Sequence, residues 1–187
     1  MLFEERMLDT GHILYWQPAL EYRINSNKIL GFDLDWTLIK PIIGEIHPVD
    51  SNDWEFMNMD LSRIADKIKA GYKFVIFTNQ GGLLNGSKLT LDGFKTRWYN
   101  IYARLQEYNI NSVYLVVSLY DNLNRKPNIG MWEFVEKELN DNIIVDRCIS
   151  MFVGDMAGRD TDFTDNDLLF AVNLGVIFEI PEIFYSK

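Results

Sequence analysis

Asp33 and Asp35 stand on either side of Leu34 in the run Gly31-Phe-Asp-Leu-Asp-Trp-Thr-Leu38, directly after the short apolar stretch 29–30. A buried strand that ends there presents two carboxylates at one edge of a sheet. One carboxylate can attack a phosphorus centre, while its neighbour exchanges the proton that the leaving oxygen needs. Asp and Thr are also common turn residues, so the pair alone favours catalysis only weakly.

Two further candidates could bind a phosphate. In Phe77-Thr-Asn-Gln80 the Thr78 hydroxyl and nearby backbone amides can hold phosphate oxygens without adding charge. In Asn124-Arg-Lys-Pro127 the Lys126 ammonium can offset negative charge that gathers around a nucleophile. The alternative for the first is an ordinary turn, and the alternative for the second is a solvated surface lysine.

A fourth candidate is the run Met151-Phe-Val-Gly-Asp-Met-Ala-Gly-Arg-Asp160, which continues as Thr161-Asp-Phe-Thr-Asp165. An apolar strand leads through Gly154 into Asp155, and Asp160 and Asp162 follow. Oxygen ligands at this density suit Mg²⁺, although an acidic surface loop would have the same composition.

The predicted elements place all four candidates together. Apolar runs at 28–32, 74–77, 113–117, 149–153 and 171–177 are mostly continuous, which is typical of strands covered on both faces in a parallel sheet. Helices are expected at 60–70, 90–108 and 131–139 from their spacing and end signals. The four candidates lie at the carboxyl ends of the first four runs, the edge where doubly wound sheets bind ligands.

The remaining segments are expected to surround this core. Residues 1–27 predict an extra strand or edge hairpin, and the irregular segment 38–54 should lie as a flap over the site. No insertion has the length of a folded lid domain, so a pocket open to a large substrate is expected. We predict one domain over residues 1–187.

Composition narrows the class of protein. The chain of 187 residues is 48% hydrophobic, enough for one substantial core, and it has no apolar run long enough to cross a membrane and no secretory signal. We therefore expect a soluble intracellular monomer without membrane contact. The single cysteine excludes an internal disulfide and a multi-thiolate zinc site. The net charge of −9 argues against a protein that coats nucleic acid.

The ordered set Asp33-x-Asp35-x-Thr37, Thr78, Lys126 and Gly154-Asp155 resembles the four motifs of the haloacid dehalogenase superfamily of phosphotransferases. More narrowly, the chain from about residue 16 to its end resembles the phosphatase domain of the polynucleotide kinase 3′-phosphatase family. The segments that carry this resemblance are Gly31-Phe-Asp-Leu-Asp35, Phe77-Thr-Asn-Gln80, Arg125-Lys-Pro127 with Gly130-Met-Trp132, Phe152-Val-Gly-Asp155 with Ala157-Gly-Arg159, and Asp162-Phe-Thr164 with Leu169-Phe-Ala-Val-Asn-Leu-Gly175.

The resemblance implies a Rossmann-like α/β fold with strand order 5-4-1-2-3 and a minimal cap. Asp33 would form an aspartyl-phosphate, and Asp35 would act as acid and then as base. Asp33, the backbone carbonyl of Asp35 and Asp155 would bind Mg²⁺, and Thr78 and Lys126 would hold the phosphoryl oxygens. Asp162 is the preferred supporting acid, with Asp160 as its rival.

Substrate contacts follow from the same motifs. Thr37 and Asn79 are assigned to substrate binding, and strand contacts are expected from Arg125, Arg159, Lys88 and Arg97, each of which is more commonly a solvated surface residue. Trp36 replaces the glycine usual in the family; it either narrows the site or stacks on a terminal base. The loop after Gln80 lacks the arginine expected in relatives, and its Gly81 and Gly86 do not complete a Walker loop.

The expected function is Mg²⁺-dependent removal of 3′-phosphates from DNA ends in DNA repair, by a stand-alone phosphatase because the chain ends at Lys187 without room for a kinase half. Two alternatives stay open. One is a small-metabolite phosphatase of the same superfamily, acting on histidinol phosphate or a sugar phosphate. The other is a catalytically silent module that binds DNA ends or a protein.

Overall fold

The computed structural model describes residues 2–43 and 46–186. The strands are β1 (Glu4–Leu8), β2 (Gly11–Trp16), β3 (Ile29–Phe32), β4 (Ile39–Lys40), β5 (Glu55–Phe56), β6 (Lys73–Asn79), β7 (Val113–Ser118), β8 (Met151–Val153) and β9 (Ile177–Glu179). The α-helices are α1 (Ser62–Lys69), α2 (Leu91–Glu107), α3 (Gly130–Glu138), α4 (Asn166–Leu174) and α5 (Pro181–Tyr185). Short 3₁₀ helices are η1 (Leu20–Tyr22), η2 (Gly81–Leu84) and η3 (Arg147–Ile149).

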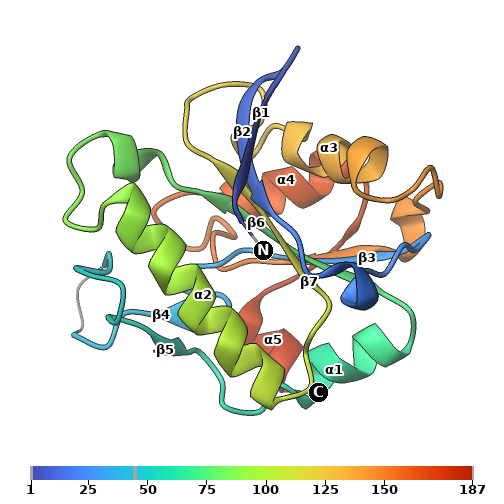
Figure 1. Ribbon diagram of the computed structural model, residues 1–187, viewed down its shortest axis with the longest axis horizontal. Coiled ribbons are helices and arrows are strands. Elements are labelled where there is room, and N and C mark those ends of the chain that lie inside the picture. Colours follow the sequence, from blue (N-terminus) through green and yellow to red (C-terminus); the bar gives the residue numbers. More distant parts are fainter. Residues whose placement is uncertain (1, 44–45, 187) are drawn as a thin grey trace.

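Seven strands form one sheet in the order β1-β2-β7-β6-β3-β8-β9. Figure 1 labels β1, β2, β7, β6 and β3 of this sheet. The five strands from β7 to β9 are parallel, and β3 lies at their centre between β6 and β8. Numbered along the chain and read from β9, they have the order 5-4-1-2-3. The structure confirms the predicted α/β class with a mainly parallel sheet.

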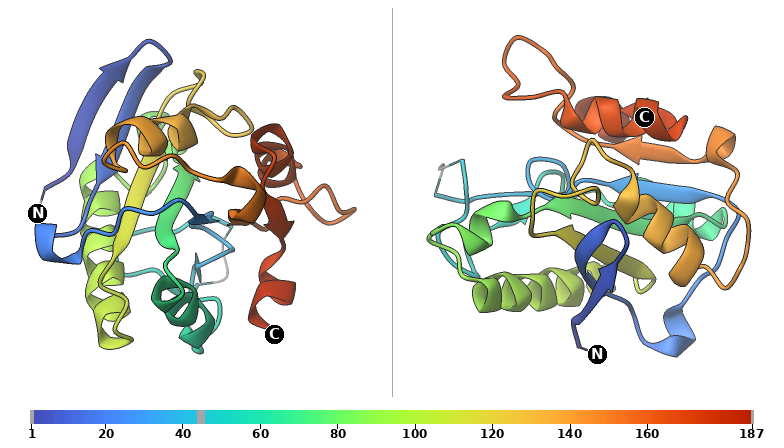
Figure 2. Two further views of the ribbon diagram at one scale, coloured as in Figure 1. Left: turned by 90° about the vertical axis from the view of Figure 1, so that its right-hand side faces the viewer. Right: turned by 90° about the horizontal axis from the view of Figure 1, so that it is seen from above.

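Helices cover both faces of the sheet, as continuous apolar strands require. On one face Leu30 and Phe32 of β3 belong to a core that includes side chains of α1, α2 and α5. On the other face Ile29 belongs to a second core with side chains of α3 and α4. Figure 2 shows these layers on either side of the sheet. The central strand is therefore fixed from above and below, which holds its carboxyl end in place.

The N-terminal segment forms the predicted edge hairpin. Strands β1 and β2 pair antiparallel, and β2 adds antiparallel to β7. Inner residues Leu14 and Trp16 are fully buried, and the Trp16 ring packs edge-on against Trp98 of α2. Figure 2 shows the hairpin rising beside the main sheet.

One predicted strand is wrong in its bounds. The run 171–177 was expected as a strand, but its first part, through Leu174, belongs to α4, and β9 begins at Ile177. The buried residues Phe170, Ala171 and Leu174 have helical spacing, and Gly175 ends the helix at a positive φ of 73°. The predicted helices correspond to α1, α2 and α3 with small shifts at their ends.

The segment 38–54, predicted as a flap, contributes β4, which pairs with β5 as a small second sheet. Its loop is organised by buried Asp53, whose carboxylate accepts hydrogen bonds from the amides of Ile42, Ile43 and Val49. Residues 44–45 of the predicted flap lie outside the described residues. Within the described chain, no helix combines the length and apolarity needed to cross a membrane.

Candidate active site

Asp33 directly follows the central strand. Its backbone amide donates to the carbonyl of Val153 at 2.9 Å, so the pairing between β3 and β8 continues one residue beyond the strand. Its carboxylate accepts a hydrogen bond of 2.6 Å from Lys126 Nζ. The nucleophile proposed from the sequence is thus anchored by its backbone and contacted by a cation.

Lys126 reaches this position from the loop between β7 and α3. Its side chain is 3% exposed, and Nζ lies 2.6 Å from both Asp33 Oδ1 and Asp167 Oδ1. Asn79 holds the lysine backbone through two hydrogen bonds of 3.0 Å, one to its carbonyl and one from its amide. Burial alone would lower the pKa of Lys126, but the two carboxylates outweigh it and raise the pKa above its usual value.

Three carboxylates meet around this lysine. One oxygen from each of Asp33, Asp155 and Asp167 lies within 4.8 Å of the other two. Burial raises the pKa of Asp33 despite the Lys126 charge, and it raises the pKa of Asp155 to about 6, with the Asp167 charge acting in the same direction. One buried ammonium cannot balance three clustered carboxylates, of which Asp167 is buried and the other two are partly buried. This donor set therefore fits a hard divalent cation such as Mg²⁺.

Asp155 is oriented by Thr37. The Thr37 hydroxyl lies 3.2 Å from Asp155 Oδ1 and accepts from the Asp155 amide at 3.1 Å. The structure places Thr37, fully buried, against the Asp155 carboxylate. A role in substrate binding stays a prediction for this residue.

The second carboxylate, Asp35, is held by two donors from separate elements. Gln80 Nε2 donates to Oδ2 at 2.6 Å, and Arg97 Nη1 donates to Oδ1 at 3.0 Å. Gln80 also donates to the Thr78 hydroxyl at 2.9 Å, which links the second motif to the first. Arg97 is 1% exposed, so the expectation that it is a surface contact for DNA is wrong.

The preferred supporting acid, Asp162, lies apart from the carboxylate cluster, and so does its rival Asp160; the cluster within the described residues contains Asp167 in their place. Asp162 instead accepts hydrogen bonds from Arg159 and from the amides of Ala157 and Arg159. The hydrogen bond from the Arg159 side chain is the main cause of a pKa lowered to about 2.

Sequence reasoning missed Asp167. It lies in the first turn of α4, is 2% exposed, and its Oδ2 accepts from the amide of Met156 at 3.1 Å. A signal was present, because Asp167 precedes Phe170, Ala171 and Leu174 at spacings of three, four and seven residues. A carboxylate on the buried stripe of an amphipathic helix indicates a partner inside the fold.

Trp36 has a backbone φ of 62°, in the left-handed region that glycine adopts most readily. The glycine that the resemblance implies at this position would adopt that conformation without strain. The Trp36 indole donates to the carbonyl of Ile46 at 3.0 Å, so it ties the 41–54 loop to the turn that carries Asp33 and Asp35.

The basic residues predicted to contact a DNA strand differ in their surroundings. Arg125, next to Lys126 in sequence, lines a groove of about 460 Å³. The other lining residues are the 81–82 glycines, Leu84, Asn85, Leu119, Tyr120 and the acidic Asp121. Arg159 is engaged by Asp162, Glu182 and the carbonyl of Asp155. Lys88 is exposed in the loop before α2.

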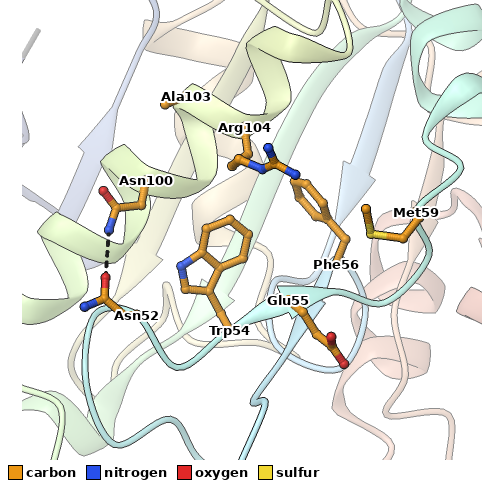
Figure 3. A pocket seen from close by; sticks show the side chains of 8 residues that line it. All are labelled: Asn52, Trp54, Glu55, Phe56, Met59, Asn100, Ala103 and Arg104. Atoms are coloured by element: carbon orange, nitrogen blue, oxygen red, sulfur yellow. Dashed lines mark hydrogen bonds between the residues drawn. The ribbon is translucent and has the colours of Figure 1, made fainter.

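A second pocket, of about 540 Å³, lies between α2 and β5 (Figure 3). Trp54, Phe56 and Met59 line it from one side, and Asn100, Ala103 and Arg104 line it from the helix. Asn100 and Asn52 are joined across it by a hydrogen bond of 3.5 Å. None of the four sequence motifs contributes to this pocket.

Comparison with known proteins gives the family. The chain is 35% identical to a bifunctional polynucleotide phosphatase/kinase of Schizosaccharomyces pombe over 86% of its own length, and it spans 38% of that relative. It is 31% identical to a polynucleotide 3′-phosphatase of Saccharomyces cerevisiae, covering 90% of this chain and 92% of that one. A crystal structure from Mesorhizobium loti, described as a HAD-like phosphatase, has a TM-score of 0.72 at 21% identity and covers 92% of this chain and 80% of its own. Residues 28–185 match the family description polynucleotide kinase 3 phosphatase, and the chain belongs to that family.

Proposed function

We propose that this protein is a polynucleotide 3′-phosphatase, which removes the terminal phosphate from DNA 3′ ends through a covalent intermediate on Asp33. The observation that carries the proposal is the position of the Asp33 carboxylate, 2.6 Å from buried Lys126 and beside Asp155 and Asp167. Family membership supports this substrate class, since a relative spanned almost completely by this chain is named polynucleotide 3′-phosphatase.

In the first step an Asp33 oxygen attacks the phosphorus atom, and the bond from phosphorus to the sugar 3′ oxygen breaks. The electron pair of that bond moves to the 3′ oxygen, which takes a proton from the Asp35 carboxylic acid. The products are the free 3′-hydroxyl end and an aspartyl-phosphate. Lys126 contributes a fixed positive charge where the phosphoryl oxygens gather negative charge.

In the second step a water oxygen attacks the phosphorus atom, and the bond to Asp33 breaks. Asp35, now ionised, accepts a proton from that water. Asp33 is then again a carboxylate, and Asp35 is again a carboxylic acid. Thr78, held beside Gln80, supplies a hydroxyl for a phosphoryl oxygen.

Asp33, Asp155 and the backbone carbonyl of Asp35 would hold Mg²⁺, with Asp167 beside them as a further acidic group. The ion supplies charge neutralisation that lets an anionic carboxylate approach an anionic ester. The fit rests on the donor set, because three clustered carboxylates share one lysine. Asp162 and Asp160 have no part in this arrangement.

The groove at Arg125 supports a polymer rather than a small ester. Its lining residues follow Gln80 on one side and precede Lys126 on the other, so it adjoins the catalytic residues along both segments. Arg125 can bind a phosphodiester and the half-exposed Tyr120 ring offers a stacking face for a base. Arg159 and Trp36 are weaker candidates, since both already have partners in the protein.

The test compares phosphate release from a 3′-phosphorylated oligonucleotide with release from thymidine 3′-monophosphate, histidinol phosphate and sugar phosphates, with and without Mg²⁺. A DNA 3′-phosphatase has the highest kcat/KM on the oligonucleotide and loses it when Mg²⁺ is removed. A higher kcat/KM on a small ester would replace the proposal by the small-metabolite alternative. Binding of the oligonucleotide without turnover would favour the silent module.

A further inference from the structure

Arg97 lies on the buried face of α2, beside Phe94, Trp98 and Ile101. Its guanidinium is 1% exposed, and Nη1 donates to Asp35 Oδ1 at 3.0 Å. Within the described residues, Nε and Nη2 are buried without a hydrogen-bond partner. The cation therefore makes its one direct ion pair in the described chain with the proposed acid and base.

Packing does not account for an arginine at this position. Its charge also acts on the carboxylate of buried Asp53, but three backbone amides already donate hydrogen bonds to that carboxylate. Burying a guanidinium with unpaired nitrogens costs free energy, and an apolar side chain of similar length avoids that cost. The surrounding core of Phe94, Trp98 and Ile101 is apolar and would accept such a side chain. The residue type is explained by what Arg97 holds rather than by how it packs.

Arg97 contacts a partly exposed carboxylate. Asp35 is 25% exposed and lies on the turn after β3, and within the described chain two side chains donate hydrogen bonds to its carboxylate. Gln80 takes Oδ2 from the end of β6, and Arg97 takes Oδ1 from α2. Two donors on separate rigid elements fix the plane of the carboxyl group, which sets the direction of proton transfer.

We infer that Arg97 is a positioning residue, which orients Asp35 from helix α2 so that the carboxyl group faces the leaving oxygen. The inference rests on the proposed phosphatase reaction. It predicts a loss that depends on the leaving group, because a 3′ alkoxide needs a proton to depart and a 4-nitrophenolate does not. A residue that serves only the fold would affect both esters alike.

The experiment measures kcat/KM of Arg97→Met on a 3′-phosphorylated oligonucleotide and on 4-nitrophenyl phosphate. For a covalent mechanism kcat/KM reports the steps through formation of the aspartyl-phosphate, so the second step does not interfere. We expect the loss on the oligonucleotide to exceed that on the aryl ester by about tenfold or more. Arg104→Met, on the exposed side of the same helix, is the matched control and should leave both values unchanged.

A double-mutant cycle with Asp35→Asn sharpens the result. If Arg97 acts through Asp35, adding Arg97→Met to Asp35→Asn causes no further loss, whereas independent effects would multiply. Equal losses on both esters, or multiplied losses in the double variant, overturn the inference. Arg97→Lys keeps the positive charge and should recover part of the oligonucleotide activity; it also replaces Arg97→Met in the comparison if that variant does not fold.

The same measurements distinguish a failure of the Arg97 inference from a failure of the proposed DNA substrate. If the wild-type protein hydrolyses 4-nitrophenyl phosphate and a small alkyl phosphate but no 3′-phosphorylated oligonucleotide, the DNA proposal fails. The comparison of alkyl and aryl esters then still tests Arg97. If wild-type activity on the oligonucleotide is high and Arg97→Met shows no dependence on the leaving group, the inference alone fails.

Discussion

At the scale of single residues, the site is defined by the sharing of one buried cation. Lys126 Nζ contacts Asp33 and Asp167 at 2.6 Å each, so its positive charge is divided between the proposed nucleophile and a neighbouring carboxylate. Asp155 lies in the same cluster, but neither of the two Lys126 ion pairs involves its carboxylate. The cluster therefore carries more negative than positive charge, which fits a divalent cation. For the same reason, removing one carboxylate should not unfold the protein.

Asp33→Asn tests the nucleophile. An amide of the same shape cannot form the acyl phosphate, so phosphate release from the 3′-phosphorylated oligonucleotide should fall by about 10³-fold or more. The substitution also removes one of three repelling carboxylates, so the thermal midpoint without Mg²⁺ should stay equal or rise. Phosphate release and circular dichroism on one preparation measure both quantities. Turnover close to the wild-type rate would overturn the enzyme assignment.

Asp167→Asn and Asp162→Asn decide which acid supports the metal. Asp167 lies in the cluster and Asp162 does not, so only the first substitution should raise the Mg²⁺ concentration needed for half-maximal activity, by about 10- to 100-fold. Asp162→Asn should instead loosen the 157–162 loop, which its carboxylate holds. Mg²⁺ titrations of phosphate release measure the difference, and an equal shift in both variants would contradict it.

At the scale of elements, the sequence predicted the sheet edge better than it predicted the last helix. Continuous apolar runs gave the parallel strands, and the polar residues after them gave Asp33, Thr78, Lys126 and Asp155 at one edge. The run 171–177 was ambiguous because a short apolar stretch is compatible with a buried strand and with a buried helix. Only the helical register places Asp167 beside Phe170 on the buried face of α4, and a strand over the same run lacks that register.

Tertiary packing accounts for the other differences. Arginine is a residue type that is mostly exposed, so the sequence alone predicts a surface position for Arg97. Only the position of α2 against the turn after β3 reveals its pairing with Asp35. The positive φ of Trp36 is likewise a property of that turn, which no side-chain pattern encodes. Residue spacing predicts which edge of the sheet carries the site but not which side chains cross between elements to complete it.

Gly154→Ala tests how closely β8 and α4 must approach. A methyl group at position 154 would lie 2.5 Å from Asp167 Oδ2 and 2.6 Å from its Cβ and Cγ, so α4 or the Asp167 side chain must shift. We expect a loss of about 1–3 kcal/mol in the free energy of unfolding and weaker Mg²⁺ activation. Denaturant unfolding and Mg²⁺ titration measure the two effects.

Gly175→Ala is the matched control for that prediction. Gly175 ends α4 with a φ of 73°, in the left-handed region, but nothing lies within 4 Å of the position that a methyl group would take. The control should lose about 1 kcal/mol through backbone strain alone and keep normal Mg²⁺ activation. A metal defect in the control, or its absence in Gly154→Ala, would contradict the close-approach argument.

At the scale of the whole molecule, the amino end of the sheet carries its own buried cation, at the opposite edge from Asp33. Lys73 begins β6, is fully buried, and donates to the carbonyls of Ile24 and Leu139 at 2.7 and 2.6 Å. It therefore joins the segment after the hairpin to the end of α3. Burial lowers the pKa of Lys73 to about 7, and the charge of Arg23 acts in the same direction.

This shift predicts a pH dependence of stability. Between about pH 7 and the ordinary lysine pKa of 10.5, the unfolded chain binds a proton that the folded protein does not bind. The free energy of unfolding should therefore rise with pH across this window, by at most about 1.4 kcal/mol per pH unit from this group. Urea unfolding of the wild type and Lys73→Met at pH 7.5 and 9 measures it. Parallel dependence in both proteins would show that Lys73 is not the source.

Net charge limits how a DNA end can be bound. The chain carries 27 acidic and 18 basic residues, a net charge of −9, so the surface as a whole repels a polyanion. Binding must then rest on a few local contacts at the terminal phosphate and at Arg125 in its groove. Lengthening the oligonucleotide beyond the nucleotides that reach this groove should add little affinity.

The dependence of KM on salt measures the number of those contacts. Each phosphate neutralised on a single strand contributes a slope of about −0.7 to the logarithmic plot of affinity against salt, so one or two contacts predict a slope no steeper than about −1.5. Arg125→Met should make the slope shallower by about 0.7, whereas Arg104→Met should not change it. A slope steeper than about −3 would mean that the DNA follows an extended basic surface. Such a surface would have to bind DNA despite the net charge of −9. This outcome would mean that the DNA follows a path elsewhere on the protein and is not bound locally at the groove.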